Sequence, residues 1–448
     1  MSEVVATAQQ GLTGKYQPYP EYKDSGVEWL GDVPEHWVLS RVKDVAVVFG
    51  GYPFDSQRFS PDVGVPLIRI RDINTELTAV YFDGDVPQEA IVENNDVLIG
   101  MDGEFNVARW KGGKAALNQR VACVRTDSDE LTTLLFYTLP FSLKVVNDLT
   151  YYTTVKHLSL EDIKKTIFAL PQGEELSNIA AFLDYETARI DLLIAQQQRL
   201  IELLKEKRQA VISHAVTKGL NPNAPMKDSG VEWLGQVPEH WGVSALGYYS
   251  MLNTGATPDR SKNQYWGGTI PWIKTGEVRY DTIYETEETI TQAALSETSV
   301  RLSKPGTLLM AMYGQGITRG RVAILGVSAT YNQACVAITP NSKVTNDFLK
   351  FFFMAGYDAL RDGGNETSQM NLNADIVSKF KVLVPSYEEQ IDIVSFLRIK
   401  LAHYEQLINK SEHAIALLQE RRTALISAAV TGKIDLRGWT QPAEEVAA

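Results

Sequence analysis

The chain has 448 residues, 44% of them apolar, which is enough for two globular domains with helical connectors and excludes a disordered protein. Segment 1–17 is polar, and no apolar run is long enough to span a membrane, so we expect a cytoplasmic protein with no membrane contact. The formal net charge of −12 argues against a protein covered by nucleic acid, but an acidic body can still carry basic loops.

A repeated phrase defines the organisation of the chain. Residues 1–22 form a polar lead-in that we expect to be poorly ordered. The words KDSGVEWLG and VPEHW then occupy 23–37 and recur at 227–241, so the chain is a tandem duplication. Gly, Pro and paired Trp residues predict compact turns in both phrases. His36 and His240 have no second His or Cys at metal-ligand spacing, so we assign them a structural role.

Each phrase is followed by short β-type runs between Gly and Pro breaks, over 38–170 and 242–384. Segments 131–146 and 347–360 are expected to be helical and to close each globule. Cys123 and Cys335 lie in apolar runs near an Asn-Gln pair, which predicts equivalent buried core strands rather than a disulfide. The pattern predicts two mixed α+β globules.

Each globule is followed by a long amphipathic helix, over 174–216 and 388–430. Apolar residues recur near every 3.5 positions, a coiled-coil pattern. A helix of about 60 Å cannot bury its own apolar stripe, so we expect the two helices to pair as an antiparallel coiled coil. The predicted interface comprises Leu176, Ile179, Leu183, Ile190, Leu193, Leu200, Leu204 and Val211 in the first helix, and Ile393, Leu397, Tyr404, Leu407, Leu418 and Leu425 in the second.

The fold class is therefore α+β, with two duplicated globules that each precede a long helix. We expect a lead-in at 1–22, a first globule at 23–172 and its helix at 173–218. A linker with the repeated turn follows at 219–241, then a second globule at 242–386, its helix at 387–432 and a tail at 433–448.

Motifs for chemistry are missing from the sequence. It has no phosphate-binding Gly-Lys-Ser/Thr loop, no His or Cys pair at metal-ligand spacing, and no Gly-x-Ser-x-Gly elbow. It also lacks the Asn/Asp-Pro-Pro-Tyr/Phe signature of amino-group DNA methyltransferases. We therefore expect no catalysis by this chain alone, no bound metal and no bound cofactor.

Polar, Gly-containing loops with basic and amide side chains differ between the copies. Arg and Lys suit phosphate and guanine, Asn and Gln suit adenine, and glycine allows close approach to a duplex. A solvated hairpin remains the alternative for either loop alone. The DNA-binding candidates are Tyr52, Ser56, Arg58, Arg69, Arg71, Asn106, Arg109, Lys111, Lys114, Thr154 and Lys156 in the first copy, and Thr257, Lys262, Lys274, Thr275, Tyr313, Gln315, Thr318, Arg319, Arg321, Gln369 and Asn371 in the second.

From 23 to 438 the chain resembles the DNA specificity subunits (HsdS) of Type I restriction-modification systems. The words that carry the resemblance are NTGATP at 253–258, GTIPWIKTGE at 268–277, PSYEEQ at 385–390, RRTALIS at 421–427 and VTG at 430–432, with 208–219 in the first copy. The first copy departs from the pattern, with PLIR at 66–69 and QGEE at 172–175.

The resemblance implies two target-recognition domains, each reading half of a split, asymmetric duplex site, with the helices as a ruler between them. It also implies two HsdM subunits, which bind S-adenosylmethionine and methylate adenine N6, and two HsdR subunits, which use ATP and Mg²⁺. A duplicated protein-binding scaffold is the alternative from another class. Sequence-dependent, salt-sensitive duplex binding distinguishes the two.

Overall fold

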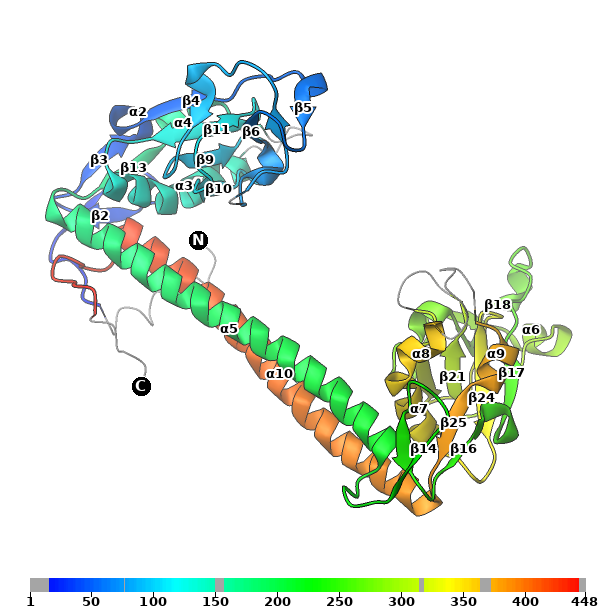
Figure 1. Cartoon of the computed structure of the whole chain (residues 1–448). Helices are drawn as coiled ribbons and strands as arrows, with labels where there is room; N and C mark the ends of the chain where they lie inside the picture. The colour runs from blue at the N-terminus through cyan, green and yellow to red at the C-terminus, as the bar shows by residue number, and fades with distance from the viewer. Residues whose placement is uncertain (1–15, 76, 150–156, 314–317, 363–371, 443–448) are drawn as a thin grey trace. The chain divides into compact units, whose positions relative to one another are not determined.

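The structure is a computed structural model that describes residues 16–75, 77–149, 157–313, 318–362 and 372–442. The chain divides into two compact units (Figure 1). Unit 1 comprises Met1–Gln198 with Glu412–Ala448, and unit 2 comprises Arg199–Ser411. These boundaries differ from the expected globule-plus-helix division, because each unit contains part of both long helices.

Unit 1 is built from two sheets and a covering helix. One sheet has the order β10-β9-β12-β4 and the other β5-β7-β6-β11-β8, and β1 pairs with β2 and β3 with β13. The strands are β1 (Tyr22–Asp24), β2 (Asp32–Pro34), β3 (Val38–Arg41), β4 (Val47–Gly50), β5 (Phe59–Ser60), β6 (Val65–Ile68), β7 (Tyr81–Phe82), β8 (Ile91–Val92), β9 (Val97–Gly100), β10 (Val107–Arg109), β11 (Ala115–Leu117), β12 (Val121–Arg125) and β13 (Ile167–Leu170). The helices are α2 (Val42–Val45), α3 (Asp129–Leu149) and α4 (Leu160–Lys165), with short 3-10 turns η1 (Ser56–Arg58), η2 (Ile70–Asp72) and η3 (Gln88–Ala90).

The main sheet of unit 1 is buried on both faces, which explains its almost continuous apolar strands. Alternate residues of a strand point to opposite faces. Val97 and Ile99 of β9 pack in one cluster with Leu134 of α3. Leu98 lies between them in sequence and packs in another cluster, with Ile68 of β6. The sheet is thus the central layer between α3 and the second sheet.

Unit 2 repeats this arrangement. Its sheets have the orders β17-β24-β21-β22-β19 and β20-β18-β23, and β14 pairs with β15 and β16 with β25. The strands are β14 (Met226–Asp228), β15 (Gln236–Pro238), β16 (Gly242–Ala245), β17 (Ser250–Thr254), β18 (Trp266–Ile273), β19 (Thr282–Ile283), β20 (Glu288–Ile290), β21 (Leu308–Ala311), β22 (Val322–Leu325), β23 (Thr330–Tyr331), β24 (Cys335–Pro340) and β25 (Lys381–Val384). The helices are α6 (Gln292–Glu297), α7 (Asn346–Ala355), α8 (Tyr357–Asp362) and α9 (Ala374–Lys379), with η4 (Leu246–Tyr248), η5 (Asn263–Tyr265) and η6 (Thr275–Glu277).

The cysteines lie on corresponding strands of the two units, β12 and β24. Both are buried and free, as predicted. Cys123 faces Leu98 on β9, whereas Cys335 faces Ala311 at the end of β21. The two cysteines therefore lie on equivalent strands but at different positions along them.

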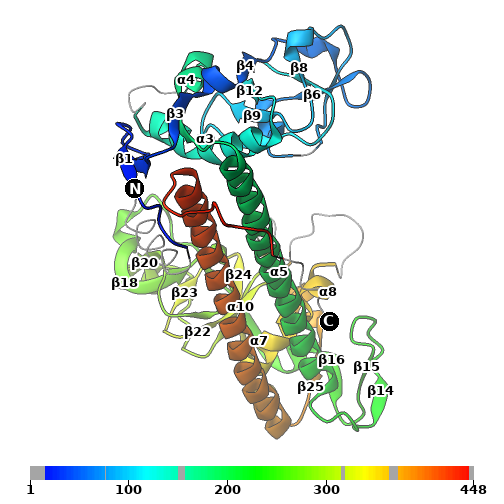
Figure 2. The same ribbon diagram turned by 90° about the vertical axis from the view of Figure 1, so that its left-hand side faces the viewer.

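The long helices α5 (Glu174–Lys218) and α10 (Tyr387–Val430) lie side by side in both views (Figure 1 and Figure 2). In unit 1, Arg422 Nε is 2.9 Å from Asp191 Oδ1, and in unit 2 Arg208 Nη1 is 3.7 Å from Glu405 Oε2. From the first pair to the second, the residue number rises along α5 and falls along α10. The two helices are therefore antiparallel, as the sequence predicted.

The apolar stripe is best covered near the helix ends. Ile179 and Leu183 of α5 and Leu425 of α10 belong to the core of unit 1, while Ile393 and Leu397 belong to that of unit 2. Ile190 and Leu204 are buried, and Leu176, Val211, Tyr404, Leu407 and Leu418 are half-buried. Leu193 and Leu200, assigned to the interface from the sequence, are 38% and 42% exposed. Ile201 and Ile408, absent from the predicted stripe, are buried in the middle of the helices instead.

The repeated VPEHW words hold the start of each long helix. In unit 1, Trp37 Nε1 donates to Glu175 Oε1 at 3.0 Å, and His36 Nε2 lies 2.8 Å from the other carboxylate oxygen. In unit 2 the same carboxylate comes from Glu389, at 3.1 Å from Trp241 Nε1 and 2.8 Å from His240 Nε2. Both histidines therefore make framework contacts, in line with their predicted structural role.

The other end of each long helix is also held by a repeated phrase. Lys218, at the end of α5, donates from Nζ to Leu234 O at 3.0 Å. Lys433, just past α10, donates to Asp32 O at 2.7 Å. The hairpins β1–β2 and β14–β15 thus each accept a hydrogen bond from a lysine at the C-terminal end of a long helix.

Residues 16–22, the end of the expected poorly ordered lead-in, are packed against the tail of the chain. Tyr19 is only 3% exposed and belongs to the core of unit 1. Asp435 N donates to Gln17 O at 2.7 Å, and Tyr22 OH donates to Gly432 O at 3.0 Å. The aromatic side chains supply enough apolar area to order this part of the lead-in. Residues 1–15 lie outside the described part of the chain.

We predict that Glu389 makes the stability of the protein depend on pH. Partial burial alone would raise the pKa of Glu389, but hydrogen bonds from His240, Trp241 and Ser386 lower it from 4.5 to about 2. Because the pKa is lower in the folded state, this stabilisation is complete above about pH 4.5 and is lost as the pH falls towards 2. In urea unfolding at a series of pH values, the stability difference between the parent and Glu389→Gln should shrink over that interval.

Glu388→Gln serves as the control, since Glu388 is exposed on the same helical turn. A stability difference between parent and Glu389→Gln that stays constant from pH 6 to pH 2.5 would contradict the assignment.

Candidate nucleic-acid interface

Several loops meet at one edge of the main sheet in unit 1. The strands are antiparallel, so β4 and β9 end at this edge, at Gly50 and Gly100, where β12 begins at Val121. The parallel strands β6 and β11 also end there, at Ile68 and Leu117. We call residues 51–52, 69–72, 101–106, 118–120 and 157 the loop edge of unit 1.

Backbone hydrogen bonds tie these loops together. Tyr52 N donates to Leu117 O at 2.8 Å, and Leu158 N donates to Met101 O at 2.7 Å. A Cβ atom at Gly51 would lie 2.2 Å from the carbonyl oxygens of Leu117 and Asn118. Glycine is therefore required where the loop after β4 crosses the end of β11.

Unit 2 has the same loop edge, residues 255–257, 274–277, 312–313, 318–321 and 332–334. Ala256 N donates to Tyr331 O at 3.0 Å, and Asn332 N donates to Ile273 O at 3.0 Å. A Cβ atom at Gly255 would lie 2.1 Å from Tyr331 O, which matches the crossing at Gly51. The two units share the backbone of the edge and differ in its side chains.

The loop edges bring together many of the DNA-binding candidates named from the sequence. These are Tyr52, Arg69, Arg71 and Asn106 in unit 1, and Thr257, Lys274, Thr275, Tyr313, Thr318, Arg319 and Arg321 in unit 2. Ser56 and Arg58 lie just beyond, in the turn η1, and Lys262 directly precedes the turn η5. Thr154, Lys156, Gln315, Gln369 and Asn371 lie outside the described residues.

Cations beside the loop edges are oriented by aromatic rings. Arg58 lies 5.3 Å from the centre of the Phe82 ring, and Lys262 lies 5.4 Å from that of Tyr265. The backbone N of both cations donates to the carbonyl of an aspartate three residues earlier, at 3.1 and 3.2 Å. The two positions are therefore equivalent.

Carboxylates hold the cations that follow β6 and β18. Arg69 Nε is 2.8 Å from Asp72 Oδ2, and Lys274 Nζ is 2.6 Å from Glu287 and 3.1 Å from Glu288. These pairs fix the side chains but also neutralise them, so we expect Arg69 and Lys274 to contribute less attraction for a phosphate backbone than free cations would.

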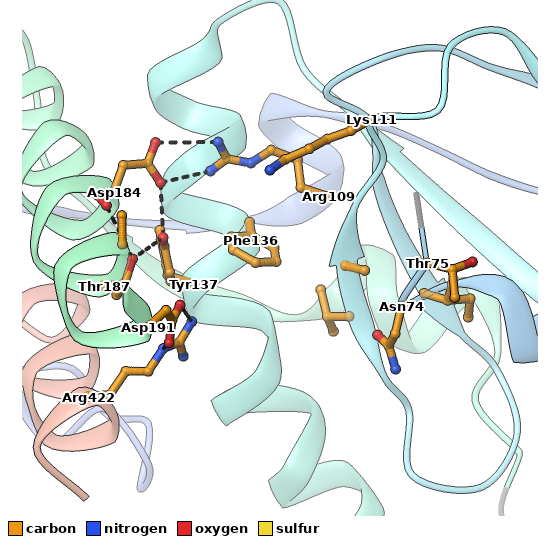
Figure 3. A pocket seen from close by; sticks show the side chains of 14 residues that line it. Asn74, Thr75, Arg109, Lys111, Phe136, Tyr137, Asp184, Thr187, Asp191 and Arg422 are labelled. Atoms are coloured by element: carbon orange, nitrogen blue, oxygen red, sulfur yellow. Dashed lines mark hydrogen bonds and ion pairs between the residues drawn. The ribbon is translucent and has the colours of Figure 1, made fainter. Parts of the chain in front are cut away.

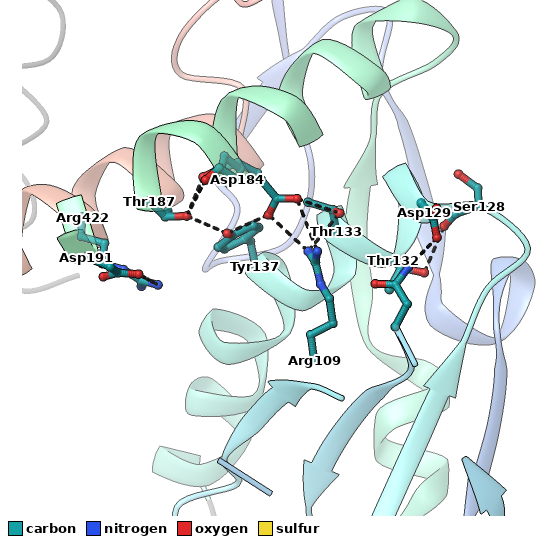
Figure 4. A network of polar contacts seen from close by, with 12 residues as sticks. Arg109, Ser128, Asp129, Thr132, Thr133, Tyr137, Asp184, Thr187, Asp191 and Arg422 are labelled. Atoms are coloured by element: carbon teal, nitrogen blue, oxygen red, sulfur yellow. Dashed lines mark hydrogen bonds and ion pairs between the residues drawn. The ribbon is translucent and has the colours of Figure 1, made fainter. Parts of the chain in front are cut away.

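Arg109, Lys111 and Lys114 are separated from the loop edge. Strand β10 runs antiparallel to β9, so Arg109 faces Val97 at the opposite end of β9. Its guanidinium lies 3.3 Å from Asp184 on α5, and Nη2 donates to Thr133 Oγ1 at 2.9 Å (Figure 4). This places Arg109, 19% exposed, in a contact between the sheet and the long helix rather than on the loop edge.

The carboxylate of Asp184 is the centre of this network. Tyr137 OH donates to Asp184 Oδ1 at 3.0 Å and lies 2.7 Å from Thr187 Oγ1. Burial raises the pKa of Tyr137 to about 12, so its hydroxyl stays protonated and can donate. Asp184 and Tyr137 were not named from the sequence, because their partner is fixed only by the packing of α3 on α5.

A cavity of about 590 Å³ adjoins the network (Figure 3). Arg109, Lys111 and Asn74 line it from the sheet side, while Asp191 and Arg422 line it from the long helices. Each carboxylate in its wall is already paired with an arginine, Asp184 with Arg109 and Asp191 with Arg422. Among the described residues of the wall, both carboxylates are therefore neutralised by an arginine.

Among the described residues, no helix is long and apolar enough to cross a membrane.

The structure thus contains two copies of one α+β unit, each with its own polar loop edge, and an antiparallel pair of long helices. A family model described as the Type I restriction modification DNA specificity domain matches residues 34–203 and again 238–415. The chain belongs to this family and carries two copies of the domain.

Named relatives match along most of the chain. The EcoBI specificity subunit of Escherichia coli is 26% identical over 434 residues, which cover 92% of this chain and 90% of that protein. The MjaVIII specificity subunit of Methanocaldococcus jannaschii is 22% identical over 425 residues, covering 90% and 94%.

Solved structures share the fold. A chain from a structure of a type I R-M system aligns with a TM-score of 0.69 at 15% identity and covers 89% of this chain and 98% of its own length. The HsdS subunit from Thermoanaerobacter tengcongensis aligns with a TM-score of 0.54 at 15% identity, covering 90% and 98%.

We predict that Arg109→Ala destabilises unit 1 by about 1 kcal/mol, because the largely buried guanidinium loses its hydrogen bond to Thr133 and its pairing with Asp184. Lys114→Ala, at an exposed position of the same segment, should change stability by less than about 0.5 kcal/mol. Chemical unfolding of both variants measures the difference. Equal stability of the two variants would show that the network around Asp184 does not hold the sheet to α5.

Proposed function

We propose that this chain is the DNA specificity subunit of a Type I restriction-modification complex, and that each unit reads one half of a two-part, asymmetric duplex site. The observation that carries the proposal is the loop edge, which has one backbone arrangement in both units and different side chains in each. Base readout needs side chains that differ from site to site on a frame that positions them in the same way.

The side chains of the loop edges include amide, hydroxyl, amino and guanidinium groups, which suit hydrogen bonds to bases and phosphates. We assign adenine-N6 methylation, with S-adenosylmethionine, to two partner methyltransferase subunits. We assign ATP- and Mg²⁺-dependent cleavage to two restriction subunits.

The exposed leucines of the long helices support contact with a partner protein. Leu192 and Leu193 in unit 1 are 59% and 38% exposed, and Leu200 and Leu203 in unit 2 are 42% and 43% exposed. Exposed apolar side chains of this size on an ordered helix are typical of protein interfaces. We propose that they contact the methyltransferase subunits.

We predict that exchanging residues 242–384 for those of another family member changes only one half of the methylated motif. The measurement is a genome-wide map of N6-methyladenine by single-molecule sequencing, in cells that carry the chain and its cognate methyltransferase. The reciprocal exchange of 38–170 is the matched control and should change only the other half. If both halves changed in either exchange, the assignment of one unit to one half would be wrong.

Deleting the chain should remove the two-part motif altogether. An identical map with and without the chain, while the methyltransferase remains active, would instead favour a protein-binding scaffold.

We further predict that the double substitution Leu200→Glu with Leu203→Glu abolishes co-purification of the methyltransferase subunit, because two carboxylates replace its apolar contact. Gln198→Glu adds a charge at an exposed position of the same helix and should leave co-purification unchanged. Equal recovery of the methyltransferase with both variants would exclude these leucines as its docking surface and would leave the proposed DNA specificity intact.

A further inference from the structure

A carboxylate at the loop edge of unit 1 holds two donors that the sequence did not single out. Asp102, just past β9, lies 2.6 Å from Arg120 Nη1 through Oδ2 and 2.8 Å from His157 Nδ1 through Oδ1. The side chain of Asp102 is 21% exposed, whereas those of Arg120 and His157 are each 55% exposed. The carboxylate is thus sheltered and its two donors reach solvent.

The backbone fixes the positions of all three residues. Met101 N donates to Arg120 O at 3.0 Å, which ties the loop after β9 to the start of β12. Asp102 and His157 form an isolated antiparallel bridge. Partial burial would raise the pKa of Asp102, but hydrogen bonds from His157 and Arg120 lower it below its ordinary value, so the carboxylate stays charged.

We propose that Arg120 reads a guanine in the half-site of unit 1 and that Asp102 is its positioning residue. This rests on the proposed DNA specificity function. A guanidinium can donate two hydrogen bonds to O6 and N7 of guanine in the major groove, the commonest specific contact between protein and DNA. With Nη1 held by Asp102, the plane of the fork is set before DNA binds and less side-chain freedom is lost on binding.

The chemistry fits a base better than a phosphate. A phosphate contact depends mainly on positive charge, which Asp102 would partly cancel. A base contact needs a fixed orientation, which Asp102 supplies. His157, the second residue paired with Asp102, is 55% exposed and gives the edge a second polar group.

The described residues of unit 2 have different side chains at the two equivalent positions, so we assign this readout to the half-site of unit 1. The bond from Met312 N to Ala334 O at 2.8 Å corresponds to that from Met101 N to Arg120 O. Ala334 therefore occupies the place of Arg120, and Tyr313, the residue after Met312, occupies that of Asp102. The second half of the motif serves as an internal control.

The test uses the full chain with its cognate methyltransferase and maps N6-methyladenine by single-molecule sequencing. For Arg120→Ala we expect one G·C position in one half of the motif to become degenerate, with a loss of discrimination on the order of 10- to 100-fold. For Arg120→Gln we expect the preference at the same position to move towards adenine. For Asp102→Asn we expect a smaller loss at that position.

Arg41→Ala is the matched control, because Arg41 is also an exposed arginine paired with an aspartate, Asp44, at 2.9 Å. Arg41 precedes the start of β4, whereas the loop edge lies at the end of that strand. It should leave the motif unchanged. Arg120→Gln retains a hydrogen-bonding side chain and provides the test if the alanine variant does not assemble.

Uniformly weaker methylation of an unchanged motif by Arg120→Ala would show a phosphate contact and overturn the inference. So would a change in the other half of the motif. Both results presuppose that the parent complex methylates a two-part motif. The absence of such a motif with the parent chain would instead refute the proposed function.

Discussion

The pairing of α5 and α10 is the constraint on which the rest of the fold depends. A helix of 44 or 45 residues with an apolar stripe is unstable alone in water, and each of these helices lies against the other. Because the pair is antiparallel, each unit receives the beginning of one helix and the end of the other. The VPEHW word binds the acidic first turn, through Glu175 or Glu389, and the neighbouring turn binds the lysine of the other helix.

This arrangement explains why the copies agree in some places and differ in others. The words at 23–37 and 227–241 contact both helix ends, so their side chains are tightly specified by packing. The main sheet of each unit is buried on both faces and admits mainly apolar residues. The described loop edges are under fewer such demands, apart from the glycines at 51 and 255 where two loops cross. Different side chains can therefore occupy the same frame.

Long-range regularities made the architecture predictable from the sequence. The duplication, the two long helices, their antiparallel pairing and the α+β class followed from repeated words and from apolar spacing. The loops that form these edges could also be located from the sequence, because turns rich in glycine and polar residues follow apolar strands. These features depend on patterns that a single sequence contains.

Individual contacts were less predictable, because they depend on strand direction and on packing between distant segments. Arg109 and Asn106 lie in one loop sequence, yet β10 carries Arg109 away from the edge towards Asp184. Arg120 follows an Asn-Gln pair and has no local feature that marks it. Its partner Asp102 is fixed only when β9 and β12 pair. The buried residues in the middle of the long helices differ from those predicted for a similar reason. Ile201 and Ile408 are buried there, whereas Leu200 is exposed.

The acidic composition is compatible with DNA recognition because carboxylates at the candidate interface act on neighbouring cations. Asp102 orients Arg120, Asp72 holds Arg69, and Glu287 and Glu288 hold Lys274. Such pairs reduce attraction for any duplex, which depends mainly on net positive charge. They leave oriented donors in place, and oriented donors distinguish one base edge from another. A subunit whose partners share the phosphate contacts can thus combine a net charge of −12 with selective reading of bases.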